Sequence, residues 1–304
     1  MACLILGNAL HAAVICSLHQ RAIPVLAADR TASVGVRVPF WRKGWLVALL
    51  QRFDVILAQD SESVFGLRRL AGQSLRVELG GRIEETTDPL PCNEAERADI
   101  ADTLKARPVW LAVGCPEAEE EIVLAAHAHA LSYAHRLLLI LAPVDMSRAP
   151  ALAKRLTQHG LATALRGEDQ EPEPDIQVLV VEGQSELGLW YRLSPVTYMG
   201  GSLSDTGSVR SPFEPVALGS AVVHGPKTGP YPDAYALLSE ARASRRVLDG
   251  PQLCSVIADL LSPDKAAQLA HSAWAAASGG AEVAERVAAA LLASLDAAAG
   301  RKAR

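Results

Sequence analysis

Residues 196–223 read VTYMGGSLSDTGSVRSPFEPVALGSAVV, and this stretch indicates how the chain folds. An apolar run, Val196–Met199, leads into a glycine-rich turn and a polar loop, and a second apolar run follows at Ala221–Val223. Neither run alternates apolar and polar residues, which is typical of parallel strands covered by helices on both faces. Between them, Ser211 and Pro212 are suited to be the N-cap and the first residue of a helix. The stretch therefore predicts a strand–helix–strand unit of a parallel sheet.

The same alternation of strand and helix extends along the whole chain. Eight short β-rich runs are predicted as strands: Cys3–Leu6, Ile23–Ala27, Asp54–Ala58, Val109–Val113, Leu137–Ala142, Gln177–Val181, Val196–Met199 and Ala221–Val223. Helical patterns separate them, including Leu10–His19, Trp45–Arg52, Ser61–Leu70, Glu94–Lys105 and Glu117–Leu131. Repeated strand–helix units predict an α/β fold built on doubly wound parallel sheets.

The chain is expected to form two Rossmann-like lobes. Residues 80–93 are rich in turn formers and poor in core residues, which favours a linker. We expect a partial N-terminal lobe over residues 1–85 and a C-terminal lobe over residues 94–298. The alanine-rich end of the chain is helical in period, and Gly279-Gly280 is expected to divide it into two helices.

Composition excludes several classes of protein. The 304 residues carry a net charge of −5, which disfavours non-specific binding to nucleic acid. Five scattered cysteines without a CxxC pair favour reduced thiols and disfavour a zinc site. The sequence contains no run of about 18 consecutive apolar residues, so no transmembrane helix is predicted. The P-loop and nucleophile-elbow motifs are absent from the sequence.

Candidate binding residues follow the predicted strands. Ligands of open α/β sheets bind at the carboxyl edge of the strands, where Gly201 and Ser202 turn the chain after Met199. The helix that starts near Ser211 suits a phosphate at its N-terminus. Glu214 either accepts hydrogen bonds from a ribose diol or only complements the helix dipole. Glu186 similarly either contacts a nucleobase or supplies charge at a helix start.

These segments together resemble the Kdo (3-deoxy-D-manno-octulosonic acid) transferases of lipopolysaccharide biosynthesis. The matching pieces, in chain order, are FDVILAQD (53–60), VELGGR (77–82), GCPEAEEE (114–121), SELGLWY (185–191), GGSL (200–203) and PFEPVALG (212–219). The resemblance implies a GT-B glycosyltransferase with two Rossmann-like lobes and a cleft between them. It also implies transfer of Kdo from CMP-Kdo to a lipid A precursor, with no cofactor and no metal in the chemical step.

The resemblance further implies a set of site residues. The donor and its nucleotide would be held by Gly114, Glu186, Leu187, Gly201, Ser202, Arg210, Ser211 and Glu214. The catalytic base of the family is a Glu in a segment upstream of where this chain starts, so we expect the start of the N-terminal lobe to be missing. The protein would be cytoplasmic and peripheral at the inner membrane. On its acceptor side, cations and aromatics suited to a membrane interface are Arg37, Trp41, Arg42 and Lys43.

The chain departs from the family pattern in the C-terminal lobe. Arg210 and Ser211 stand where the family has His-Asn, and Val144 stands where it has a donor-holding Arg. Arg210 either meets a phosphate or sugar carboxylate or is a solvated loop cation. Arg148 of the same family run is retained, and the role of only beginning the next helix is also open to it. Two other functions therefore stay open, a GT-B transferase of another nucleotide sugar and a catalytically inactive paralogue or binding module.

The histidines offer no clear site. His127 and His129 lie two apart on a predicted helix, so they diverge and are expected at the surface or between helices. His224 follows a strand at the expected binding edge, and both ligand contact and a structural hydrogen bond are open to it.

Overall fold

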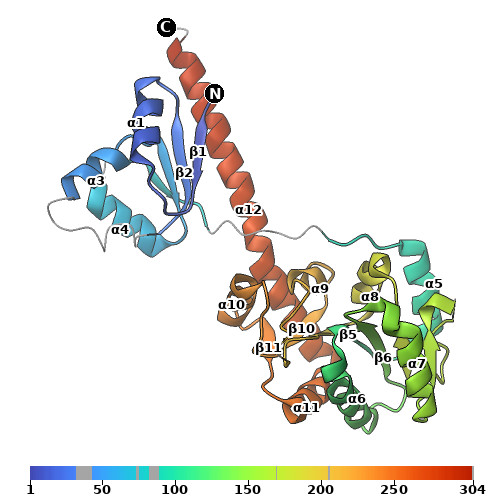
Figure 1. Cartoon of the computed structure of the whole chain (residues 1–304). Helices are drawn as coiled ribbons and strands as arrows, with labels where there is room; N and C mark the ends of the chain where they lie inside the picture. The colour runs from blue at the N-terminus through green and yellow to red at the C-terminus, as the bar shows by residue number, and fades with distance from the viewer. Residues whose placement is uncertain (32–42, 73–74, 82–88, 169, 205, 303–304) are drawn as a thin grey trace. The chain divides into compact units, whose positions relative to one another are not determined.

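The structure, a computed structural model, describes residues 1–31, 43–72, 75–81, 89–168, 170–204 and 206–302. The chain forms two compact units, shown in Figure 1. The first unit holds residues 1–86 and 278–304, and the second holds residues 87–277.

The first unit is a four-stranded parallel sheet with helices on both faces. Its strands pair in the order β1-β2-β3-β4. They are β1 Cys3–Leu6, β2 Val25–Arg30, β3 Val55–Ala58 and β4 Val77–Leu79. The helices beside them in sequence are α1 Ala12–Gln20, α3 Lys43–Leu50 and α4 Ser61–Ala71. One face buries Ile15, Leu49 and Leu67 of these helices, and the other packs against Val283 and Val287 of the last helix.

The second unit is a seven-stranded sheet in which every pairing is parallel. The strands pair in the order β11-β10-β9-β5-β6-β8-β7. They are β5 Val109–Cys115, β6 Leu138–Pro143, β7 Thr163–Leu165, β8 Val178–Val180, β9 Val196–Met199, β10 Ala221–His224 and β11 Ser244–Arg246. The helices are α5 Glu94–Leu104, α6 Glu117–Leu131, α7 Ala149–Gln158, α8 Leu187–Leu193, α9 Phe213–Ala217, α10 Pro232–Glu240, α11 Gly250–Leu260 and α12 Pro263–Lys302.

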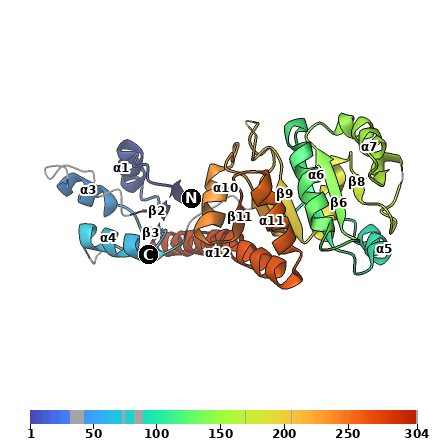
Figure 2. The ribbon, with the colours of Figure 1, turned by 90° about the horizontal axis from the view of Figure 1, so that it is seen from below.

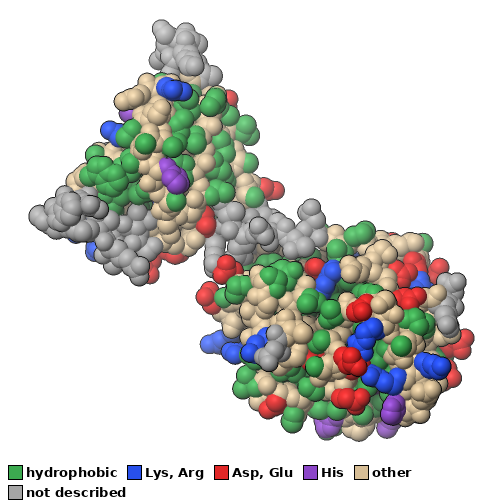
Figure 3. Space-filling view, viewed as in Figure 1, with side chains coloured by type: hydrophobic (Ala, Val, Ile, Leu, Met, Phe, Trp, Pro, Cys, Tyr) green, Lys and Arg blue, Asp and Glu red, His purple; other side chains and the backbone are tan. Residues whose placement is uncertain are grey.

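Two apolar layers sandwich this second sheet. Helices α6, α7 and α11 contribute to one layer, and α5, α8, α9 and α10 contribute to the other. The view in Figure 2 shows α6, α11 and the start of α12 along one side of the unit. On the face of this unit drawn in Figure 3, acidic and basic side chains are interspersed. Burial of both sheet faces explains why the strand sequences are continuously apolar.

The strand order places a topological switch between β5 and β9. The chain enters the sheet at β5, continues to β6, β7 and β8 on one side, and crosses to β9, β10 and β11 on the other. In open α/β sheets, ligands bind outside the carboxyl ends of the strands at such a point. The candidate site is therefore expected beyond Cys115 and Met199.

The predicted fold class is confirmed, and all eight predicted strands are present. Three short strands, β4, β7 and β11, were not predicted because none of them is a continuous apolar run; their sequences are VEL, TAL and SRR. The expected break at Gly279-Gly280 is wrong, since α12 is one helix of 40 residues. Each glycine costs a helix only about 1 kcal/mol relative to alanine, and the alanine-rich turns on both sides favour continuation.

Among the described helices, none combines the length and the apolar character needed to cross a bilayer.

Candidate functional site

The glycine-rich turn after β9 is held by a buried carboxylate from α6. Glu119 is 0% exposed. Its Oε2 accepts the backbone N–H of Gly201 at 2.8 Å and the hydroxyl of Tyr198 at 2.8 Å. Its Oε1 accepts the backbone N–H groups of Leu203 at 2.9 Å and Ser204 at 2.6 Å. Four donors on one carboxylate fix the shape of the turn, and sequence reasoning did not single out this residue.

Glycines allow this turn to lie directly on the end of β5. A Cβ on Gly200 would be 2.5 Å from the carbonyl oxygen of Gly114 and 2.6 Å from the Cα of Cys115. Gly201 adopts a φ of +78° and Gly114 a φ of +62°, a region that favours glycine. The structure thus brings the predicted site residues Gly114 and Gly201 to one place at the sheet edge.

Ser202 uses its side chain within the fold. The residue is 0% exposed, and its hydroxyl donates to the carbonyl of Met199. The same oxygen accepts the backbone N–H of Gly225 at 2.7 Å. The hydroxyl therefore joins the turn after β9 to the loop after β10, so any role of Ser202 toward a ligand would fall to its backbone.

Glu214 is held in a buried polar triad with Arg210 and Tyr191. Its Oε2 accepts the Tyr191 hydroxyl at 3.0 Å and Arg210 Nε at 2.8 Å, and Arg210 Nη2 is also 2.8 Å away. Burial first, and then the Glu214 charge, raise the pKa of Tyr191 well above its ordinary value. Arg210 is thus a half-buried ion-pair partner and not a solvated loop cation. Among the described residues, no bond is recorded to Oε1 of Glu214, so that oxygen is available to a ligand.

Ser211 lies just before the short helix that carries Glu214. The helix α9 begins at Phe213 and its N-cap residue is Pro212, so the predicted cap at Ser211 and start at Pro212 are each one residue too early. The Ser211 hydroxyl oxygen still accepts the backbone N–H of Phe213 at 3.3 Å. Its contact with a nucleotide stays a prediction.

Two adjacent pockets lie at the carboxyl edge of this sheet. The first, called here the β5 pocket, has a volume of about 180 Å³. It is lined by Val113, Gly114, Pro143, Val144, Met146, Gln184, Leu187, Val209 and Arg210. The second, the β8 pocket, has a volume of about 410 Å³ and is lined by Arg166, Gly167, Glu182, Gly183, Ser185 and Glu186. Residues 183–187 separate the two, so the pockets are neighbours on either side of one short segment.

The predicted site residues divide between these pockets. Gly114, Leu187 and Arg210 line the β5 pocket, and Glu186 lines the β8 pocket. Arg166 pairs with Glu186 at 3.2 Å, and it also pairs with Glu96 of α5. Glu186 is therefore fixed by a guanidinium as well as standing at a helix start.

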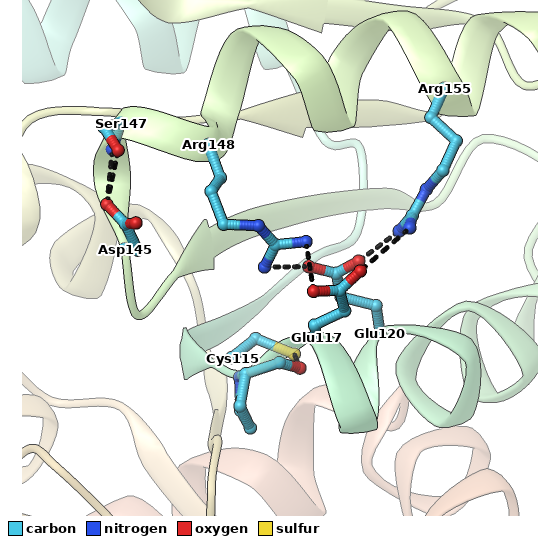
Figure 4. Close-up of polar contacts among 8 residues, drawn as sticks. Cys115, Glu117, Glu120, Asp145, Ser147, Arg148 and Arg155 are labelled. Atoms are coloured by element: carbon cyan, nitrogen blue, oxygen red, sulfur yellow. Dashed lines mark hydrogen bonds and ion pairs between the residues drawn. The ribbon is translucent and has the colours of Figure 1, made fainter.

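A four-residue ion-pair cluster joins α6 to α7, as Figure 4 shows. Glu120 is 1% exposed and pairs with Arg148 at 3.1 Å and with Arg155. Glu117, which is exposed, also lies 3.2 Å from Arg148. Arg148 thus does more than begin a helix, because it anchors the loop after β6 to the start of α6.

The loop between β6 and α7 carries the position where the resemblance expects an arginine. Val144 occupies it, is 41% exposed and lines the β5 pocket. Asp145, next to it, accepts the backbone N–H of Ser147 at 3.1 Å and its hydroxyl at 2.6 Å, and these bonds lower the pKa of the carboxyl. Val144 supplies no charge, so this wall of the pocket is apolar.

The histidines have structural partners. His224 is 3% exposed, its Nδ1 is 2.7 Å from the carbonyl of Gly225, and its ring lies 4.4 Å from that of Tyr235. His127 is 1% exposed, and its Nδ1 accepts Trp110 Nε1–H at 3.2 Å, so its expected place at the surface or between helices is corrected to the core against β5. Burial lowers the pKa of each to about 4. Among the described residues, no cluster of three metal-ligating side chains occurs.

The predicted membrane-side residues are mostly outside the described part of the chain. Arg37, Trp41 and Arg42 belong to residues 32–42, which the structure does not describe. Lys43 is the first residue of α3 and is exposed, and Trp45 of the same helix is 56% exposed.

Comparison with known proteins bears on what this edge binds. No protein-family model matches the chain. The 3-deoxy-D-manno-octulosonic acid transferase of Haemophilus influenzae is 27% identical over 246 residues, which are 79% of this chain and 56% of that protein. The Bordetella pertussis enzyme of the same name is 26% identical over 276 residues, or 88% of this chain and 63% of that protein.

A solved structure is also similar to part of this chain. The C-terminal CMP-Kdo binding domain of WaaA from Acinetobacter baumannii matches with a TM-score of 0.55 and 26% identity. The match covers 60% of this chain and 98% of that domain. The chain is a relative of the Kdo transferases, with the two parallel α/β units of the GT-B fold. It spans about half the length of the curated Kdo transferases it matches, from 44% to 63%.

Proposed function

We propose that this Kdo transferase relative is a glycosyltransferase of lipopolysaccharide biosynthesis. Its second unit would hold CMP-Kdo, and Kdo would pass to a lipid A precursor. The observation that carries the proposal is the edge of the second sheet. There Gly114 and Arg210 line the β5 pocket and Arg210 pairs with Glu214, in a unit similar to a CMP-Kdo binding domain over 98% of that domain.

Glu214 is the residue proposed to grip the ribose. Three bonds from Arg210 and Tyr191 converge on its Oε2 and hold the carboxylate in one orientation. Its Oε1 is then available to accept a ribose hydroxyl. A carboxylate oriented before binding loses little freedom when the ligand arrives, which favours affinity.

The phosphate is proposed to lie against the turn formed by Gly114 and Gly201. Gly114 lines the β5 pocket, so a ligand there would lie beside its main chain. Arg210 lines the same pocket, and although it pairs with Glu214 its guanidinium has further N–H groups to donate. Main-chain and guanidinium donors directed at the departing CMP phosphate would stabilise the charge that develops there.

The first unit is proposed to bind the acceptor. Lys43 and Trp45, both exposed on α3, suit a membrane interface and a phosphorylated lipid. We also propose that the protein contacts the inner membrane peripherally, at its cytoplasmic face. None of the described residues is assigned as the general base.

A calorimetric titration with CMP, with UMP as the comparison ligand, tests the donor site. We expect the chain to bind CMP, and Glu214→Ala to weaken CMP binding about 10- to 100-fold, as for loss of a charged hydrogen bond. The matched control is Glu121→Ala, which removes an exposed glutamate of α6. A folded protein that binds neither nucleotide would reject the proposal.

A second candidate function is a donor-binding module without transfer activity. Val144 favours it, because the charge of a donor-holding arginine is absent from that wall of the β5 pocket. Incubation with CMP-Kdo and a lipid A precursor separates the two functions. Kdo-labelled lipid supports the transferase, whereas CMP binding with no product, even when the upstream segment of a relative is supplied, supports the module.

A further inference from the structure

We propose that Glu182 reads the nucleobase, by accepting a hydrogen bond from the exocyclic amino group of cytosine in the β8 pocket. The inference rests on the proposed function, since it assumes that the second unit binds a cytidine nucleotide. It assigns a residue to the choice between cytosine and uracil, which the glycine-rich turn and Glu214 cannot make.

Glu182 lies at the carboxyl edge of the sheet because of the strand pairing. Strands β7 and β8 run parallel with Leu165 opposite Val180, so the residues that follow each strand are neighbours. A Cβ on Gly167 would lie 1.4 Å from Oε1 of Glu182. The Glu182 carboxylate therefore lies against the main chain of Gly167. A side chain on residue 167 would occupy the same space.

The Glu182 carboxylate is unlike its neighbour Glu186. Arg166 holds Glu186 through contacts of 3.2 Å and 3.3 Å. For Glu182, no hydrogen bond or ion pair is recorded among the residues that the structure describes. Glu182 thus supplies the half-buried wall of the β8 pocket with a carboxylate that can accept hydrogen bonds from a ligand.

The charge of the pocket determines which ligand groups fit. Its lining supplies two carboxylates, Glu182 and Glu186, and one guanidinium, Arg166, which Glu96 also shares. This excess of negative charge disfavours a phosphate and favours a donor-rich group. Cytosine presents an amino donor at its C4 position, whereas uracil presents a carbonyl oxygen, which a carboxylate repels.

The neighbouring β5 pocket leaves room for the rest of the nucleotide. Gln184 and Leu187 line that pocket, while Gly183, Ser185 and Glu186 line the β8 pocket, so one short segment contributes to both. Gly114 and Arg210, proposed above for the phosphate, belong to the β5 pocket. A nucleotide laid across residues 183–187 would have its base and its phosphate in pockets of different charge.

The test is a pair of titrations, CMP and UMP, on the full chain and three variants. Glu182→Gln keeps the size of the side chain but adds an amide donor that suits uracil. Gly167→Ala keeps the Glu182 carboxylate in the protein, but the new methyl group pushes it from its position. Glu240→Gln, on the exposed face of α10, is the matched control.

We expect the unchanged chain and the control to prefer CMP over UMP about 10-fold or more. We expect Glu182→Gln to bring the two affinities to within about 3-fold, mainly by improving UMP, and Gly167→Ala to lower the preference in the same direction. A preference for CMP that survives Glu182→Gln overturns the inference and leaves the donor site standing. Equal weakening of both nucleotides, or no preference in the unchanged chain, also overturns it. A chain that binds neither nucleotide rejects the proposed function together with this inference.

Discussion

The carboxylate of Glu119 accepts the backbone N–H of Gly201 at 2.8 Å, across 82 residues of sequence. The bond joins the first turn of α6 to the loop after β9, on the two sides of the topological switch. Glu119 is wholly buried, and its carboxylate accepts from three main-chain N–H groups of that loop and from the Tyr198 hydroxyl of β9. The shape of the candidate site therefore depends on a residue that need not touch a ligand.

Glu119→Gln is expected to destabilise the second unit by about 3 kcal/mol or more. The amide nitrogen of glutamine would face N–H donors, so two buried donors would lose their acceptor. The measurement is the urea-unfolding free energy, with Glu121→Gln on the exposed side of the same helix as the control. If the unfolding free energies of the two variants agree within about 0.5 kcal/mol, Glu119 does not organise the turn.

Gly200→Ala is expected to destabilise by about 2 kcal/mol or more, because the new methyl group would meet main-chain atoms of Gly114 and Cys115 that cannot move independently. The control is Gly160→Asn. Gly160 has open space around it but a φ of +86°, where asparagine is strained less than other L residues, so a smaller loss of about 1 kcal/mol, from backbone strain alone, is expected. Thermal unfolding followed by circular dichroism measures both. Equal stability of the two variants would mean that the turn after β9 shifts freely on β5.

The ion-pair cluster of Figure 4 predicts non-additive losses. Arg148→Ala and Arg155→Ala are each expected to cost about 1–2 kcal/mol, because Glu120 keeps one partner. The double variant leaves the buried Glu120 charge unpaired and is expected to cost about 3–5 kcal/mol. Glu117→Gln, which alters the exposed carboxylate, should change stability by less than about 0.5 kcal/mol. A double-mutant cycle of unfolding free energies checks this, and strict additivity contradicts it.

Acid is expected to destabilise the protein through its buried histidines. Burial lowers the pKa of His127 and of His224 to about 4, below the ordinary value of 6.5. The folded state then binds fewer protons than the unfolded state between these values. Each histidine's contribution is complete above pH 6.5 and is lost as the pH falls toward 4.

The size of this effect is about 2 kcal/mol per histidine between pH 7.5 and pH 5.0. Urea unfolding at the two pH values measures it. His127→Gln should reduce the loss by that amount, whereas replacement of the exposed His159 should not. The same acid sensitivity in the chain and in His127→Gln would contradict the assignment.

The sequence predicted the parts of this protein that depend on local patterns. Apolar runs fixed by burial on both sheet faces, such as Val196–Met199, were predicted with bounds equal or close to those observed. The start of α9 was predicted to within one residue, because helix-start signals such as Ser211-Pro212 act over a few residues. Strands β7 and β11 could not be predicted, since TAL and SRR are not apolar runs and their pairing depends on the neighbouring strand.

The site was predicted in position but not in its internal bonding. The resemblance and the strand edge identified Gly201, Ser202 and Glu214. The burial of the Ser202 hydroxyl and the contact of Glu119 with the turn arise from pairings across about 20 to 85 residues, which no local pattern encodes. Arg210 illustrates the same limit, because its partner Glu214 lies four residues away through a loop and not along a helix face.

The most direct test of the donor-site assignment is a crystal structure of the chain with CMP. The account predicts the ribose on Oε1 of Glu214, the phosphate against Gly114 and Gly201, and the cytosine in the β8 pocket. Nucleotide bound away from the carboxyl edge of the second sheet, or crystals that stay empty at saturating CMP, would contradict the account.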